Sequence, residues 1–135
     1  MEIFLNIEGI EPAIRRLTAL GMAIPGTVHD TCLEWSNKVL AQAKELVPID
    51  TSALQESGHV EDWSVGGVAN WKSINMFIAF GGLTSIQFVD YAVFVHEDLQ
   101  AHHPHGQAKF LEQPWESGIP ELWQRLGNAM EGILR

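Results

Sequence analysis

The longest regular pattern in this chain is an apolar stripe at helical spacing. From Val28 the apolar positions advance by three or four residues, which keeps them on one face of a helix with 3.6 residues per turn. Thr27 can cap the start of this helix, and Pro48 ends it because proline lacks an amide proton. We therefore predict a long amphipathic helix between Thr27 and Pro48. Its apolar positions are Val28, Cys32, Trp35, Val39, Ala43 and Leu46.

The N-terminal region has two other patterns. Ile3, Leu5 and Ile7 alternate with other residues, and this period of two predicts a short strand over residues 1–7. Residues 12–20 have apolar positions at helical spacing, followed by Gly21. The stretch predicts a separate short helix that stops before Pro25.

The middle of the chain has turn residues and alternating apolar runs. Residues 50–52, Asp-Thr-Ser, can cap a further helical turn through Gln55. Residues 60–65 predict a weak strand, and residues 74–80 are expected to form a hairpin with residues 86–88 around the Gly81-Gly82 pair.

The C-terminal half is predicted to be mostly helical. Residues 91–95 fit either a strand or one helical turn, and the pattern leaves both open. Residues 107–112 predict a helix, Pro114 and Pro120 predict a break, and residues 122–134 resume the helix with Trp123 on its apolar face. The fold class is therefore α+β, in which a small antiparallel sheet of about three to five strands packs against a long N-terminal-half helix and a C-terminal helix.

Composition narrows the class of protein. A chain of 135 residues with 46% hydrophobic content fits a single domain over residues 1–135. Eight basic and seventeen acidic residues give a formal charge of -9, which repels phosphate backbones, so we expect no specific nucleic-acid binding. The absence of a bilayer-length apolar run and of a positive N-terminal region predicts a soluble protein without a membrane partner. Cys32 is the only cysteine, so no internal disulfide forms.

One cluster has residue types that bind metals. His96 and Glu97 precede His102, His103 and His105, and imidazoles with a carboxylate can bind zinc or nickel. The spacing disfavours a preformed site, because His102 and His103 are adjacent, Pro104 stiffens the run and no i,i+4 helical pair of ligands arises. We expect a surface turn here, with no metal and no cofactor.

No other pattern specifies an active site. Cys32 lies on the apolar stripe and is expected to be a core residue rather than a nucleophile. The serines lack the glycine-flanked turn of a catalytic serine. Glu61-Asp62 and Glu97-Asp98 are adjacent acids of the kind found in solvated loops. The expectation is that the protein is not an enzyme.

The five tryptophans divide into two groups. Trp35 and Trp123 lie on helix stripes and are expected in the core. Trp63, Trp71 and Trp115 fall in irregular regions, where large aromatic side chains either pack locally or meet another protein. The sequence leaves these two alternatives open.

Three segments carry a family resemblance. They are Ala43-Lys44-Glu45-Leu46-Val47-Pro48-Ile49-Asp50-Thr51-Ser52-Ala53-Leu54, Tyr91-Ala92-Val93-Phe94-Val95-His96-Glu97 and Gly106-Gln107-Ala108-Lys109-Phe110-Leu111-Glu112. In this order, and over most of the chain, the sequence resembles the tail-completion or neck proteins of long-tailed bacteriophages, often called tail components or minor structural proteins. Two positions depart from the family. Ser52 stands where these proteins commonly have glycine, and Asp98 follows Glu97 in place of a glycine-threonine pair.

The resemblance implies a structural virion protein of the phage neck. Such a subunit forms a homo-oligomeric ring, a hexamer or a dodecamer, that completes the tail and joins it to the head during assembly in the bacterial cytoplasm. Its partners are head-side connector or adaptor proteins and tail-terminator or tail-tube proteins. DNA passes through the lumen, where acidic residues would prevent it from binding.

Within this hypothesis Asp50 and Thr51 cap the turn after the long helix, Tyr91 and Phe110 pack that turn against the sheet and last helix, and Lys109 pairs with Glu97 or Glu112. The residues with expected structural or interface roles are Asp50, Thr51, Trp63, Trp71, Tyr91, His96, Glu97, Lys109, Phe110 and Trp115. Two rival functions remain. One is a small monomeric phage adaptor, and the other is a metal-dependent hydrolase that uses His96, Glu97 and the histidines at 102–105.

Overall fold

The computed structural model describes residues 11–48, 52–67, 71–100 and 105–135. The helices are α1 Glu11–Leu46, α2 Ala53–Glu56, α3 Ala92–Glu97 and α4 Glu112–Leu134. The strands are β1 His59–Asp62, β2 Met76–Ala79, β3 Gly82–Leu83 and β4 Phe88–Val89. These elements confirm the predicted α+β class with its long helix, C-terminal helix and small antiparallel sheets.

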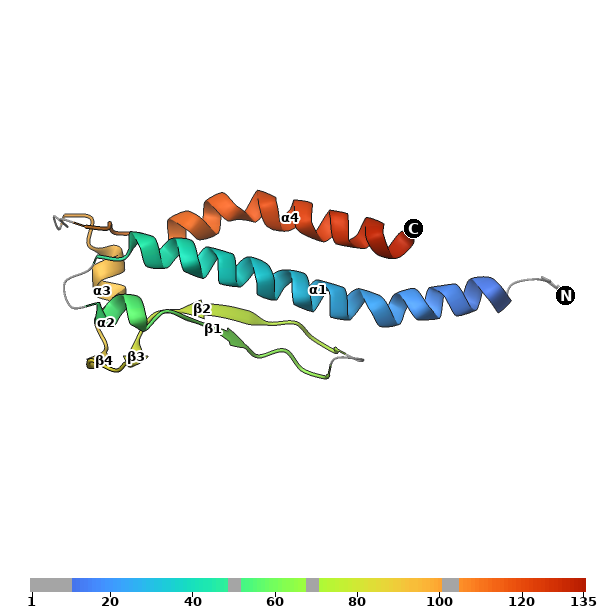
Figure 1. The fold of residues 1–135 in the computed structure, drawn as a ribbon, viewed down its shortest axis with the longest axis horizontal. Coiled ribbons are helices and arrows are strands. Elements are labelled where there is room, and N and C mark those ends of the chain that lie inside the picture. Colours follow the sequence, from blue (N-terminus) through green and yellow to red (C-terminus); the bar gives the residue numbers. More distant parts are fainter. Residues whose placement is uncertain (1–10, 49–51, 68–70, 101–104) are drawn as a thin grey trace, which may run out of the picture.

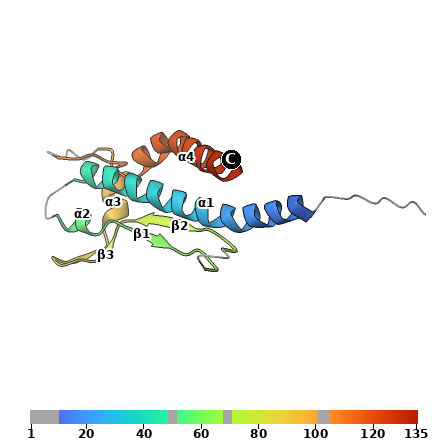
Figure 2. The same ribbon diagram turned by 45° about the vertical axis from the view of Figure 1, so that its right-hand side comes forward.

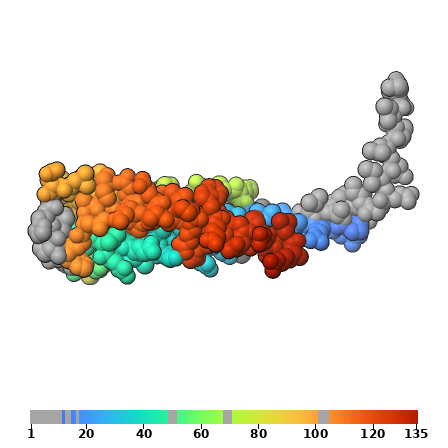
Figure 3. Space-filling view, turned by 90° about the horizontal axis from the view of Figure 1, so that it is seen from above, coloured from blue at the N-terminus to red at the C-terminus, as the bar shows by residue number. Residues whose placement is uncertain are grey.

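The long helix α1 is the middle layer of the molecule (Figures 1 and 2). It lies between α4 on one side and the β1–β2 pair on the other. The helix α4 runs antiparallel to α1, because Gly118 lies beside Trp35 while Leu134 accepts a hydrogen bond from Arg16. Seen from above, the first turns of α1 extend past the C-terminal end of α4 (Figure 3).

The predicted apolar stripe of α1 forms much of the core. Trp35, Val39 and Ala43 are buried. The Trp35 indole donates a hydrogen bond from Nε1 to the Gly118 carbonyl at 2.9 Å, and its ring meets the edge of Trp115 at a centroid distance of 5.0 Å. A methyl group on Gly118 would lie 3.3 Å from the Trp35 ring, so a glycine here lets α4 approach α1 closely.

The predicted break between two N-terminal helices is wrong, because α1 continues through Gly21 and Pro25. An interior proline costs a helix about 3 kcal/mol. Here α4 contacts α1 on both sides of Pro25, through Arg16 to the Leu134 carbonyl and through Trp35 to the Gly118 carbonyl. These tertiary contacts hold the two halves of α1 in line.

The predicted break within the C-terminal helix is also wrong, because α4 is continuous from Glu112 to Leu134. Pro114 lies in the first turn, where a missing amide proton leaves no hydrogen bond unmade. Pro120 is interior, and α4 is tied to α1 on both sides of it. The Trp35 indole binds the Gly118 carbonyl, and Lys38 forms an ion pair with Glu121.

The strand pairing differs from the predicted hairpin. Residues 76–79 of β2 pair antiparallel with β1, in the register His59 with Ala79, while β3 pairs with β4. The turn residues explain the difference. Gly81 and Gly82 both have positive φ, and the Ser57 hydroxyl accepts the Gly81 amide proton at 3.0 Å. The chain therefore leaves β2 at this point and begins a separate, short hairpin.

Two further expectations concern the chain around α2 and α3. Of the ambiguous residues 91–95, residues 92–95 are helical as the start of α3, and Tyr91 is the N-cap of that helix. Ser52 precedes α2 with a left-handed φ of 65°, and its side chain makes no capping hydrogen bond, so its predicted capping role is wrong. Asp50, Thr51 and the predicted strand at residues 1–7 lie outside the described residues.

Candidate interaction site

Residues 43–48, 91–97 and 106–112 meet at one end of the molecule. The Gln107 amide donates to the Leu46 carbonyl at 2.8 Å, which joins the stretch before α4 to the end of α1. The Lys109 amide donates to the His96 carbonyl at 2.7 Å, which joins the same stretch to α3. Phe110 is buried where they meet. The core cluster around it is Val47, Ala53, Leu54, Val89 and Ala92, with Leu46, Phe80, Tyr91, Val95 and Leu111 packed against it.

Gly106 is the closest backbone contact between these segments. Its φ is +83°, and a Cβ there would lie 2.5 Å from both the Leu46 carbonyl oxygen and the Pro48 nitrogen. Only glycine fits such an approach without a shift of the backbone. The residue therefore sets how near the stretch before α4 comes to the end of α1.

His96 links α3 to the start of α4. Its Nε2 accepts a hydrogen bond from the Glu112 amide at 3.2 Å, and its Nδ1 lies 2.7 Å from Glu97 Oε1. An accepting Nε2 assigns the proton to Nδ1, which then donates to Glu97. The ring also packs edge-on against Phe110 at a centroid distance of 5.0 Å. His96 thus satisfies one of the free amides of the α4 N-terminus.

Lys109 forms ion pairs with both carboxylates that were expected as its partners. Its Nζ contacts Glu97, and lies 3.0 Å from Glu112 Oε2. These two carboxylates raise the pKa of Lys109, with Glu97 the larger cause. Lys109 in turn lowers the pKa of Glu97, with a further contribution from His96. The lysine itself has a left-handed φ of 56°, which directs the chain from α3 into α4.

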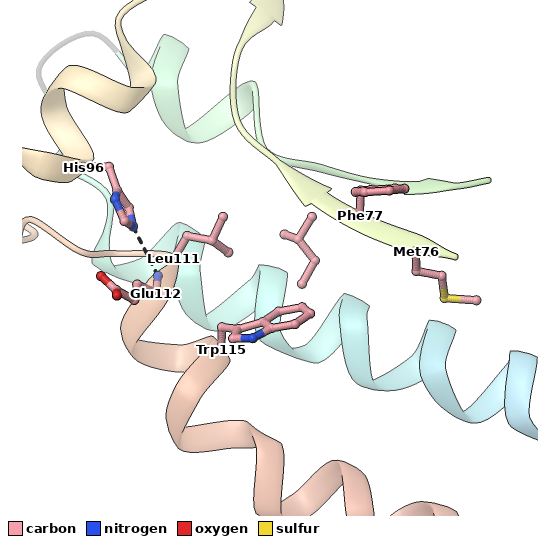
Figure 4. Close-up of a pocket in the computed structure, with 7 residues that line it drawn as sticks. Met76, Phe77, His96, Leu111, Glu112 and Trp115 are labelled. Atoms are coloured by element: carbon pink, nitrogen blue, oxygen red, sulfur yellow. Dashed lines mark hydrogen bonds between the residues drawn. The ribbon is translucent and has the colours of Figure 1, made fainter. Parts of the chain in front are cut away.

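An apolar groove lies beside this network (Figure 4). One part, of about 310 Å³, lies between β2 and the start of α4 and is lined by Met76, Phe77, Ile78, His96, Leu111, Glu112 and Trp115. The second part, of about 240 Å³, continues toward α3 and is lined by Ile78, Ala79, Phe80, Ala92, Val93, His96, Glu97, Phe110 and Leu111. Because Ile78, His96 and Leu111 line both parts, we call the whole the β2 groove.

Large apolar side chains are exposed around this end of the molecule. Val93 and Phe94 on α3 are 76% and 72% exposed, although apolar side chains of this size are usually buried. Other exposed apolar residues near the groove or on the β3–β4 hairpin are Phe77, Leu83, Ile86, Phe88 and Trp115. Exposed apolar surface that is contiguous marks a site of protein contact more often than a site of catalysis. The groove and its rim can therefore bind a protein segment.

A second polar cluster fastens the β1–β2 pair to α1. The buried His29 donates from Nδ1 to Asp30 at 3.0 Å and from Nε2 to Asp62 at 2.6 Å, and its ring stacks on Trp71 at a centroid distance of 4.2 Å. Two donated protons require the charged imidazolium. Asp30 is the largest cause of the raised pKa of His29, burial opposes it, and Asp62 adds to it. Hydrogen bonds from Ser64 and His29 lower the pKa of Asp62 to about 2.

This cluster predicts that stability falls as the pH rises above neutrality. The pKa of His29 is raised above 6.5, so its contribution is complete below that pH and is lost as the pH rises through the folded-state pKa. The contribution of Asp62, whose pKa is lowered, is present above about pH 3.8 and is lost toward pH 2. Urea unfolding at about pH 6 and about pH 8.5 should therefore show lower stability at the higher pH.

The matched variant is His29→Gln, which keeps a polar side chain but does not titrate. Its free energy of unfolding should change less with pH than that of the native chain, because the titrating contact is missing. His59, whose pKa is raised by the Ser57 carbonyl and Glu61, remains in both proteins and cancels in the comparison. Equal pH slopes for the two proteins would rule out His29 as the source.

The structure separates the tryptophans differently from the prediction. Trp35 is buried as expected, but Trp123 is 69% exposed, so its predicted core position is wrong. Trp115 lines the β2 groove, whereas Trp63 and Trp71 lie near the other end of the β1–β2 pair.

Cys32, expected in the core, is only half-buried, and burial raises the pKa of its thiol.

Several groove and cluster residues were missed by sequence reasoning. The pattern around Met76 and Ile78 predicts only a strand, and the pattern around Leu111 predicts only a helix, with no role in a site. His29 had a usable signal, because it lies three residues before Cys32 and so on the apolar face of α1. A histidine on such a face predicts a buried polar contact, although its partner Asp62 is distant in sequence.

The metal cluster considered from the sequence is only partly described. His102 and His103 lie outside the described residues. In the described ranges no three histidine, cysteine or acidic side chains are grouped closely enough to hold a metal ion. The helices of those ranges also include none with the length and apolar character needed to cross a bilayer.

Comparison with models of known protein families, with curated proteins and with solved structures finds no match to this chain.

Proposed function

We propose that this chain is a structural subunit of the neck of a long-tailed bacteriophage. In this proposal it forms a homo-oligomeric ring, a hexamer or a dodecamer, that completes the tail and joins it to the head connector. The ring contacts head-side connector or adaptor proteins on one side and tail-terminator or tail-tube proteins on the other. It acts by binding rather than by catalysis, and it is assembled in the host cytoplasm and kept in the virion.

The observation that carries this proposal is the meeting of the three family-like segments beside the β2 groove. Leu46, His96, Gly106 and Lys109 are held together by backbone contacts rather than by an arrangement of nucleophile and base. Such contacts fix the shape of a surface. A rigid surface next to exposed apolar side chains is what a subunit needs to bind a neighbour in a fixed orientation.

Charge and surface chemistry support the same reading. A ring requires each subunit to offer two different surfaces, one of which binds the other surface of the next copy. The β2 groove is a concave surface for one such contact, and the β3–β4 hairpin, with the exposed Leu83 and Phe88, is a separate apolar surface. The formal charge of -9 would prevent DNA from binding to the ring as it passes through the lumen.

The test is the mass of the native chain in solution, measured by light scattering over a wide range of concentrations, with and without chelator. A discrete oligomer of fixed mass that is unaffected by chelator is expected, and electron microscopy of the same sample should show rings. A chain that stays monomeric at every concentration would contradict self-assembly into a ring and favour the rival monomeric adaptor. A mass or stability that changes with chelator would favour the metal-dependent hydrolase.

A further inference from the structure

The β2 groove follows an open edge of the sheet. β2 pairs with β1 on one side, and within the described ranges no strand pairs with its other side. The Trp63 and Val65 amides donate to the Asn75 and Ser73 carbonyls, so the odd-numbered residues of this strand direct their backbone groups toward the β1 side. Since direction alternates along a strand, Met76 and Ile78 present free amide and carbonyl groups at the open edge.

The groove beside this edge has the shape and polarity for an added strand. Met76 and Ile78 of β2 form one wall of the groove. The other wall is formed at the start of α4 by Leu111 and Trp115. In Figure 4 Met76 points toward the helices and Phe77 points to the opposite face of the sheet. A strand in this groove would bond to the backbone of β2 and direct every second side chain toward Leu111 and Trp115.

We infer that the occupant of the β2 groove is the N-terminal segment Glu2–Ile7 of a second copy of this chain. The segment has the pattern that the groove requires, because Ile3, Leu5 and Ile7 alternate and so fall on one side of a strand. A two-stranded sheet is marginal by itself, and a third strand would stabilise it. This inference rests on the proposed function, for which it names the contact between neighbouring copies.

The segment of the same copy cannot reach the groove. Met76 at the near end of the groove pairs with Asp62, which is hydrogen-bonded to His29 of α1. The rise along α1 from Glu11 to His29 is about 27 Å. The residues from Ile7 to Glu11 span at most about 14 Å when fully extended. A strand in the groove must therefore come from another molecule, and such an exchange of segments is a contact that can close into a ring.

The experiment uses the full chain with Leu5→Asp, in which a charge on the apolar side of the segment keeps the chain's own copies out of the groove. A fluorescent peptide of residues 1–10 with the native sequence is titrated against it and followed by anisotropy. Saturable binding is expected. The same peptide with Leu5→Asp should bind at least about tenfold more weakly.

Two variants on α3 locate the binding site. Val93 lines the groove, and Phe94 is equally exposed but lies outside both parts of it. In the Leu5→Asp chain, adding Val93→Asp should weaken peptide binding by about tenfold or more, and adding Phe94→Asp should leave it unchanged. Circular dichroism confirms that each variant is folded.

Failure of saturable binding, or equal weakening by the two α3 substitutions, would overturn the inference. The mass of the native chain tests the proposed function separately. A native ring with no peptide binding would mean that neighbours meet through another surface. Peptide binding by the Leu5→Asp chain would support the groove contact even if the native chain did not close into a ring.

Discussion

Replacing Gly106 by alanine is expected to lower the free energy of unfolding by about 3 kcal/mol or more. The added Cβ would lie 2.5 Å from the Leu46 carbonyl oxygen and the Pro48 nitrogen, and both are backbone atoms that cannot rotate away. The φ of +83° adds strain for any residue with a side chain. The end of α1 and the stretch before α4 would have to separate, which would also break the hydrogen bond from Gln107 to Leu46.

Urea unfolding measures this effect, and two substitutions serve as controls. Gly127→Ala in α4 adds a methyl group where no atom lies within 4 Å, and should stabilise the protein by up to about 1 kcal/mol through helix propensity. Ser52→Gly should also stabilise it, by about 1 kcal/mol, because Ser52 has a left-handed φ of 65°. A Gly106→Ala protein as stable as the native chain would contradict the close packing of the three segments.

Replacing Trp35 by alanine is expected to cost about 4 kcal/mol of stability. Its side chain is only 2% exposed between α1 and α4, and its indole donates to the Gly118 carbonyl and packs against Trp115. Removal leaves a cavity and an unpaired carbonyl at the main contact between the two long helices.

Trp123→Ala is the matched control, because Trp123 also lies on a helix stripe in the sequence but is 69% exposed in the fold. Its removal should change stability by less than about 1 kcal/mol. Thermal or urea unfolding followed by circular dichroism compares the two variants without dependence on tryptophan fluorescence. Similar losses for both would mean that Trp123 is buried in solution, as it would be in an oligomer that covers this face of α4.

Sequence reasoning succeeded where a pattern is local and repeated. The stripe through Trp35, Val39 and Ala43 predicted the buried face of α1, because helical periodicity does not depend on distant residues. The tertiary structure corrected the breaks predicted at Pro25 and Pro120. Proline penalties are local too, but contacts between α1 and α4 on both sides of each proline outweigh them.

The candidate site was found from the sequence only in part. The predicted structural or interface residues include His96, Glu97, Lys109, Phe110 and Trp115, which lie in or beside the β2 groove. Met76, Ile78 and Leu111, which form much of its walls, were not selected, since nothing in their own neighbourhood distinguishes them from ordinary strand or helix residues. Trp63 and Trp71 were selected with them but lie elsewhere.

The sequence by itself determined the fold class, the long amphipathic helix and its buried face. These follow from periodicity and turn chemistry within a few residues of each position. Only the tertiary structure decided that β2 pairs with β1, that Gly106 lies against the end of α1 and that an open strand edge borders an apolar groove. Those features depend on contacts between residues far apart in the chain, whose packing energies exceed local preferences.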